Sequence, residues 1–371
     1  MPACALIIYL LVIDILSFLQ YNIITNNSEG ESMTHHQIVT ANSNNMDFIE
    51  SGSVNLIVTS PPYPMIEMWD DLFICQDNTI KNDLECGNGY SSFLKMHALL
   101  NKTWKECDRV LADHGFICIN IGDATRTLGG EFQLFSNHSK IIEFFSALGY
   151  SVMPDILWRK PSNSPNKFMG SGMYPAGAYV TYEHEYILIF RKGGKRTFKG
   201  KEKKYRQKSA YFWEERNVWF SDLWEIKGTS QVLNSVTVRN RNASFPFEIP
   251  YRLVNMYSAE NDTVLDPFCG LGTTNLACMT AHRNSIGVEI DNGIADLARE
   301  RLNVSANDLN KIISSRISAH LSFIASLSEE KKAKCYQNDN HQFLVKTRQE
   351  TMIHISNVSK IVKEDSKFLC Y

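Results

Sequence analysis

The chain has 371 residues, of which 44% are hydrophobic, so it can form one large domain or two modest ones, and global disorder is excluded. The formal net charge of −2 means that a nucleic acid would have to bind a local basic patch rather than the molecule as a whole. The nine cysteines form no CxxC pair and no zinc-spaced cluster with histidine, which favours reduced thiols in a cytoplasmic protein and argues against a metal site.

Residues 1–32 contain an apolar run that is difficult to assign. Asp14 interrupts the run, its length is marginal for crossing a membrane, and no lysine or arginine precedes it as in a signal peptide. We expect residues 1–32 to be either a packed N-terminal extension or sequence upstream of a true start at Met33. A membrane span is the less favoured alternative.

Residues 33–190 show the alternation of strands and helices that is typical of α/β proteins. The segment 54–58 is rich in apolar and β-branched residues, as expected for a strand buried on both faces, and the prolines that follow end it. Other strands are predicted at 37–40, 115–121, 152–158 and 185–190, and helices at 91–111 and 140–148.

Residues 191–241 interrupt this alternation. The stretch 191–208 has ten lysines or arginines and one glutamate, a local charge of +9, and aromatic residues follow it. We interpret 191–241 as an inserted recognition region whose small core contains Trp213, Trp219 and Trp224. A basic run suits contacts with nucleic-acid phosphates, although a solvated loop would have the same composition.

The alternation resumes in residues 242–303. Helices are predicted at 247–257 and 294–302, and strands at 263–265 and 285–290. The remaining residues, 304–371, read as a polar, partly helical C-terminal extension to which we assign no chemistry. Repeated strand–helix pairs predict a doubly wound, mainly parallel sheet with helices on both faces.

A glycine-containing turn, 266–274, follows the strand at 263–265. Gly270 and Gly272 would let the backbone approach a ligand, and Thr273 or Thr274 could cap the next helix, whose N-terminus attracts anionic groups. Glu289 lies 19 residues beyond Gly270, where an acid can accept hydrogen bonds from ribose hydroxyls. The turn and the acid together predict a nucleoside cofactor.

A second motif, Thr59-Ser60-Pro61-Pro62-Tyr63, follows the buried strand at 54–58. A proline pair has no N–H groups, so its carbonyls remain free acceptors, and Ser60 adds a hydroxyl that can accept as well. Two acceptors of this kind suit the N–H groups of a planar amine. The ring of Tyr63 could stack on a nucleobase turned out of a duplex.

Together the two motifs, within residues 36–303, resemble the beta-class DNA amino-methyltransferases of restriction–modification systems. The resemblance implies a mixed, mainly parallel, seven-stranded sheet, S-adenosylmethionine (SAM) as the methyl donor, and double-stranded DNA as the substrate. It also implies a functional pairing with a cognate restriction endonuclease, without direct contact. His184-Glu185, before the basic stretch, resembles another element of these enzymes.

Site residues follow from the same resemblance, one position at a time. The implied catalytic residues are Ser60, Pro61, Pro62 and Tyr63. The implied cofactor-binding residues are Asn42, Phe245, Pro246, Asp266, Pro267, Phe268, Gly270, Gly272, Thr273 and Glu289. Asn42 stands where the family often has aspartate. We expect DNA contacts from Lys195, Arg196, Lys199, Lys201, Lys203, Lys204, Arg239 and Arg241.

The residue at position 60 helps to distinguish between the candidate target bases. Serine is usual in cytosine-N4 enzymes, and a preceding threonine strengthens that assignment, whereas aspartate or asparagine is usual in adenine-N6 enzymes. We therefore expect cytosine N4, with adenine N6 as the alternative. Cytosine-C5 methylation requires a cysteine nucleophile, and the chain has no Pro-Cys dipeptide to supply one. An RNA or protein methyltransferase and a catalytically silent nucleic-acid-binding module are the rival hypotheses.

Overall fold

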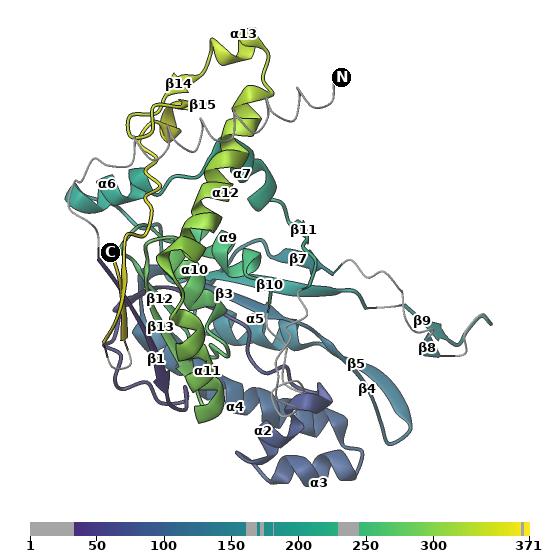
Figure 1. Ribbon diagram of the computed structural model, residues 1–371. Helices are drawn as coiled ribbons and strands as arrows, with labels where there is room; N and C mark the ends of the chain where they lie inside the picture. Colours follow the sequence, from purple (N-terminus) through teal and green to yellow (C-terminus); the bar gives the residue numbers. More distant parts are fainter. Residues whose placement is uncertain (1–32, 161–168, 171–173, 181, 229–244, 365–366) are drawn as a thin grey trace, which may run out of the picture.

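The computed structural model describes residues 33–160, 169–170, 174–180, 182–228, 245–364 and 367–371 (Figure 1). The expected N-terminal extension, 1–32, and the two arginines at positions 239 and 241 lie outside the described residues. Among the described residues, no helix is long and apolar enough to cross a membrane.

Seven strands form the predicted sheet, in the order β7–β10–β3–β2–β12–β13–β1. The mixed α/β fold class expected from the sequence is therefore confirmed. The bounds of these strands are β1 Thr34–Thr40, β2 Val54–Thr59, β3 Leu111–Ile121, β7 Ile156–Arg159, β10 His184–Arg191, β12 Thr263–Asp266 and β13 Asn284–Glu289.

Four more strands extend this sheet to eleven within the described residues. β11 (Leu223–Glu225) pairs with β7, and β17 (Lys367–Cys370) lies between β1 and β16 (Ile361–Glu364). β6 (Ser151–Val152) pairs with β10. The single strand predicted at 152–158 is in fact split into β6 and β7 around Pro154, which has no N–H to donate to a ladder.

Strand direction is the property of the sheet that positions the site. β3, β2, β12, β13 and β1 are parallel to one another, so their carboxyl ends meet at one edge of the sheet. β10 is antiparallel to β3, and Tyr186 pairs with Ile121 while Arg191 pairs with Phe116. The start of β10 therefore lies at the same edge, and its end lies at the opposite edge.

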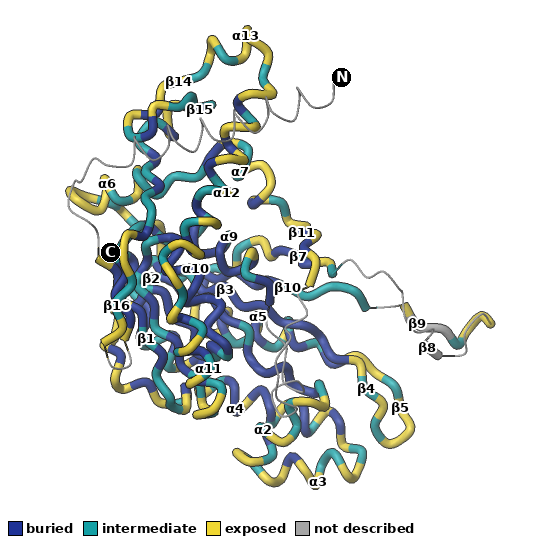
Figure 2. Tube along the Cα trace, viewed as in Figure 1, coloured by how far each residue is buried: buried dark blue, intermediate teal, exposed yellow. Residues whose placement is uncertain are grey.

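Helices cover both faces of the sheet, because alternate residues of the central strands point to opposite sides. In β2, Ile57 packs with the cluster that includes Trp104 and Phe145, whereas Leu56 and Val58 pack with a second cluster. α4 and α5 cover the first face, and α9 and α10 cover the second. Figure 2 shows these central strands as the most buried part of the molecule.

The helices of the sheet region and its flanks are α2 Asp70–Ile74, α3 Thr79–Glu85, α4 Gly89–Val110, α5 Asn137–Ala147, α6 Gly200–Lys208, α7 Trp213–Trp219, α9 Glu248–Tyr257, α10 Thr273–Thr280, α11 Asn292–Leu302, α12 Ala306–Ala325 and α13 Glu329–Lys332. Short hairpins are formed by β4 Ala124–Leu128 with β5 Glu131–Phe135, by β8 Met169–Gly170 with β9 Ala178–Tyr179, and by β14 Tyr336–Gln337 with β15 Leu344–Val345. Two short 3₁₀ helices span Glu67–Trp69 and Arg348–Glu350.

The predicted inserted region and C-terminal extension pack against each other. The ring of Phe212 stacks on His320 of α12 at 3.7 Å, and Arg316 of α12 forms an ion pair with Glu215 of α7. The expectation of a separate tryptophan core is wrong, because Trp224 belongs to the core of the main sheet and Trp213 is 40% exposed. The five-part division of the chain stays a prediction.

Candidate functional site

The two sequence motifs lie side by side, because β2 and β12 are neighbours in the sheet. Leu56 pairs with Val264 and Ile57 with Leu265, so both motifs begin at the same edge. One pocket is bordered by both of them. The catalytic motif contributes Ser60, Pro61 and Pro62, and the glycine-containing turn contributes Asp266, Pro267, Phe268, Cys269, Gly270, Leu271 and Thr273.

Asp266 links the two motifs directly. Thr59 donates to its Oδ1 at 2.6 Å, and Thr274 of α10 donates to its Oδ2 at 2.7 Å. The backbone N–H of Phe268 donates to the same carboxylate at 3.2 Å. Burial raises the pKa of Asp266 to about 6, and these hydrogen bonds oppose the rise. The carboxylate thus joins both strand ends to the start of α10.

The turn after β12 depends on its glycines. Gly270 has φ +50° and Gly272 has φ +70°, a left-handed conformation that favours glycine, and no atom would meet a Cβ at Gly270 within 4 Å. Gly272 is the N-cap of α10 and no side chain caps the helix, so the expected cap by Thr273 or Thr274 is wrong. Thr273 instead accepts a hydrogen bond from Arg301 at 2.9 Å.

Glu289 stands at the end of β13 and borders the pocket. Its Oε2 accepts from the backbone N–H of Gly270, and its Oε1 accepts from that of Asp291, both at 3.0 Å. Burial raises the pKa of Glu289. The side chain therefore joins the glycine turn to the start of α11, and each oxygen keeps a second lone pair with which to accept from a ligand.

The other predicted cofactor residues are distributed around the same pocket. Asn42 borders it just beyond β1, and its Oδ1 accepts from the N–H of Asn44 at 3.0 Å. Phe245 also borders it and is 6% exposed. Pro246 is not among the lining residues; its carbonyl accepts from the N–H of Ile249 at the start of α9.

An apolar wall completes the pocket, and no local pattern in the sequence predicts it. Its side chains come from the segments between β2 and β3 and from the start of α11. They are Trp69, Leu72, Phe73, Leu99, Leu100, Ile290 and Ile294. A pocket with carboxylates along one side and an apolar wall suits a ligand that is cationic at one point and has a flat apolar ring elsewhere.

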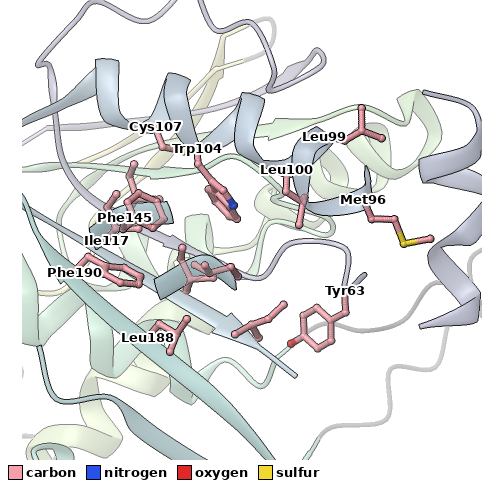
Figure 3. Close-up of a cluster of buried hydrophobic side chains, with 14 of the residues drawn as sticks. Tyr63, Met96, Leu99, Leu100, Trp104, Cys107, Ile117, Phe145, Leu188 and Phe190 are labelled. Carbon is pink, nitrogen blue, oxygen red and sulfur yellow. The ribbon is translucent and has the colours of Figure 1, made fainter. Parts of the chain in front are cut away.

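Tyr63 has a different position from the one expected. It is 7% exposed, is absent from the pocket lining, and packs in the core cluster with Met96 and Leu188 (Figure 3). Its ring also lies against Gly122, where an added Cβ would be 3.0 Å from Cε2. In this structure the ring therefore offers little free surface to a base, and the stacking role stays a prediction.

The hydroxyl of Tyr63 belongs to a polar network at the catalytic end. It donates to Glu185 Oε2 at 2.8 Å and lies 3.1 Å from Ser60 Oγ. Asn120 donates to both the Tyr63 hydroxyl and Glu185, at 2.7 and 2.6 Å. Lys160 forms an ion pair with the other oxygen of Glu185. The resemblance indicated Glu185 as a family element, but no sequence pattern indicated Asn120 or Lys160.

The structure does not bring the basic stretch 191–208 to the pocket. Lys192 donates to the carbonyls of Asp108 and Leu111 near the start of β3, and Arg196 forms a 2.7 Å ion pair with Asp262, just before β12. These contacts lie at the amino ends of the parallel strands. In Figure 1, α6 lies above and α11 below the labels of β12 and β13. A phosphate-binding role for this stretch stays a prediction that its placement does not support.

Comparisons with known proteins show which family this chain resembles. The DNA methylase family (N6_N4_Mtase) matches residues 54–300. Type II methyltransferase M.MthZI of Methanothermobacter thermautotrophicus is 52% identical over 325 residues, which are 87% of this chain and 90% of that protein. Type II methyltransferase M.MjaI of Methanocaldococcus jannaschii is 50% identical over 282 residues, 73% and 92% of the two chains. TTHA0409 of Thermus thermophilus, solved in complex with S-adenosyl-L-methionine, has a TM-score of 0.55 at 28% identity and covers 72% of this chain and 92% of that chain.

Proposed function

Because this chain belongs to the DNA methylase family, we propose that it methylates the N4 amino group of cytosine in duplex DNA. The observation that carries the proposal is that Ser60 and Pro61 border the same pocket as Gly270 and Glu289. The methyl acceptor would lie against the first pair and the methyl donor against the second. The order of the motifs along the chain supports placement in the beta class.

The cofactor is SAM, and the residues of the pocket fit it. SAM supplies an electrophilic methyl group on a positively charged sulfur. Asp266 and Glu289 place two carboxylates beside the pocket, which favours a cation, and Gly270 has no Cβ to obstruct a ligand. Glu289 would accept from the ribose hydroxyls, and Phe268 with the apolar wall would contact the adenine ring.

The acceptor side is suited to an exocyclic amine. The lone pair of such a nitrogen is delocalised into the base, so the free amine is a poor nucleophile. Hydrogen bonds from its two N–H groups to Ser60 Oγ and to the Pro61 carbonyl would favour a pyramidal nitrogen with its lone pair directed at the methyl group. Positioning and electrostatics carry such a reaction without a covalent enzyme intermediate. The base would have to leave the duplex stack to reach the pocket.

Two strands on the side of β10 away from β3 end at the site edge. β7 and β11 are parallel to each other, and both end at this edge, where residues 161–183 and 227–244 begin. Phe245 returns the chain directly to the pocket. Base contacts by Arg239 and Arg241, which follow β11 along the chain and lie outside the described residues, remain part of the proposal. In the cell the enzyme would be cytoplasmic and would protect host DNA against a cognate type II endonuclease.

Neutralising the basic helix should have little effect on DNA binding. With Lys201, Lys203 and Lys204 all changed to alanine, we expect the Kd for duplex DNA to change less than about twofold, because α6 lies at the edge opposite the pocket. The measurement is a fluorescence-anisotropy titration at several salt concentrations. A roughly tenfold loss for all DNA sequences with a flatter salt dependence would restore the phosphate-binding role. The variant with alanine at both Arg239 and Arg241 is the positive control, in which we expect weaker DNA binding.

Methyl transfer to DNA followed by nucleoside analysis tests the proposed function. Duplex DNA is incubated with the enzyme and SAM that carries a tritiated methyl group, then digested, and the modified nucleoside is identified by mass spectrometry. We expect N4-methylcytosine. N6-methyladenine would keep the enzyme class and overturn the base assignment. Incorporation only into RNA or protein, or none at all, would overturn the proposal.

A further inference from the structure

The hydrogen bonds around Tyr63 have a defined direction. A carboxylate has no hydrogen to donate, so Glu185 Oε2 must accept from both the Tyr63 hydroxyl, at 2.8 Å, and Asn120 Nδ2, at 2.6 Å. The same requirement fixes the orientation of the Asn120 amide, because the reversed amide would place its oxygen against the carboxylate. Asn120 consequently also donates to the Tyr63 oxygen, at 2.7 Å.

The direction of the last bond in the network follows. The Tyr63 hydroxyl has one hydrogen, and a carboxylate at 2.8 Å is a stronger acceptor than a neutral hydroxyl at 3.1 Å. Ser60 is therefore the donor in its bond with Tyr63. With its only hydrogen directed into the protein, Ser60 Oγ has lone pairs free to accept from a group in the pocket that it borders.

Glu185 is held in place from two further sides. It is the second residue of β10 and pairs with Trp158 of β7. Lys160, two residues beyond Trp158, forms the ion pair with Glu185 Oε1 and lies 4.5 Å from the centre of the Trp158 ring. Asn120 comes from β3, the next strand of the sheet. Contacts from β3 and from the residue that follows β7 thus fix the carboxylate, with Oε1 facing Lys160 and Oε2 facing Tyr63 and Asn120.

We propose that Glu185 is a positioning residue that acts through Tyr63 to fix Ser60 as a hydrogen-bond acceptor for the substrate amine. This inference rests on the proposed function and adds to it a reason why the enzyme takes an amine. An N–H group can donate to Ser60 as it is oriented here. A carbonyl or ring nitrogen in the same place would meet lone pairs and be repelled.

The Glu185→Gln variant removes the carboxylate acceptor that sets this orientation. Lys160 faces Oε1, so the amide would direct its oxygen to Lys160 and its NH₂ group toward Tyr63. That NH₂ group would also face the NH₂ group of Asn120, which donates to Oε2 in the wild type, so Tyr63 would lose its carboxylate acceptor and Ser60 would no longer be fixed as the donor. In single-turnover assays with saturating DNA and SAM, we expect the methyl-transfer rate to fall about 10- to 100-fold. The KM for DNA, from steady-state assays, and the Kd for SAM, from calorimetric titration, should stay within about twofold of wild type.

Glu183→Gln is the matched control. Glu183 precedes the same strand and forms a 3.8 Å ion pair with exposed Arg159, without any contact to Tyr63. We expect a wild-type transfer rate. A second comparison uses Tyr63→Phe, which removes the connecting hydroxyl. In that background, adding Glu185→Gln should change the rate by less than about twofold, because residues that act through one another give non-additive effects.

Three outcomes would overturn the inference. The first is a wild-type transfer rate for Glu185→Gln, and the second is an equal loss of rate from Glu185→Gln with and without Tyr63→Phe. The third is a loss of both SAM affinity and thermal stability in Glu185→Gln, which would indicate only a structural role. The expected difference between Glu185→Gln and its controls does not depend on whether the methylated base is cytosine or adenine. A wild-type enzyme that methylates no DNA would instead mean that the proposed function has failed.

Discussion

Replacing Ser60 with alanine is expected to lower kcat about 100- to 1000-fold, because the variant loses an acceptor aimed at the reacting amine. The SAM affinity should stay within about twofold of wild type, since no contact joins Ser60 to the glycine turn among the hydrogen bonds of the described residues. Steady-state methylation assays give kcat, and calorimetric titration with SAM gives the affinity.

Ser53→Ala provides the control for the serine substitution. Ser53 directly precedes β2, at the opposite end of the strand from Ser60, and its hydroxyl donates only locally, to the Glu50 carbonyl at 2.7 Å. This variant should methylate DNA at the wild-type rate. If Ser60→Ala kept more than about a third of the wild-type kcat, Ser60 could not have the role in amine binding that we assign to it.

The second large effect is expected for Glu289→Ala, in SAM affinity. Hydrogen bonds to a charged group contribute about 1.5–3 kcal/mol, so losing those to ribose should weaken SAM binding roughly 10- to 150-fold. The backbone N–H groups of Gly270 and Asp291 would lose their acceptor as well, which loosens the turn that borders the cofactor. Calorimetric titration with SAM measures the change directly.

Two further variants define what the Glu289 result means. Glu289→Gln keeps one carbonyl oxygen as an acceptor, so its SAM affinity should fall between those of wild type and the alanine variant. Glu300→Ala removes an exposed carboxylate from α11, the helix that follows Glu289 along the chain, and this variant should bind SAM with wild-type affinity. Unchanged affinity in Glu289→Ala would remove the ribose-binding role.

The sequence predicted the fold and the meeting of the two motifs because both depend on local patterns. Strands and helices follow from periodicity, and the ends of parallel strands share one edge of a sheet. The glycines at 270 and 272 and the acid at 289 are close enough along the chain to be recognised as a unit. The structure brings Gly270 and Glu289 into direct contact, at 3.0 Å.

The location of the basic stretch could not be predicted in the same way. A strand's composition does not show whether it is parallel or antiparallel to its neighbours. β10 is antiparallel to β3, and this single reversal sends residues 191–208 to the edge opposite the pocket. The Tyr63 network could not be predicted for a related reason, since Tyr63 and Glu185 are 122 residues apart and meet only through strand order.

The hydrogen bond between Thr59 and Asp266 matters for exchanging motifs between related enzymes. The hydroxyl of Thr59 is committed to the carboxylate of the neighbouring motif, so this residue has a structural role inside the protein whichever base is methylated. A graft of either motif from a relative would have to carry the partner residue with it. Position 59, together with position 266, is thus a guide to compatible chimeras.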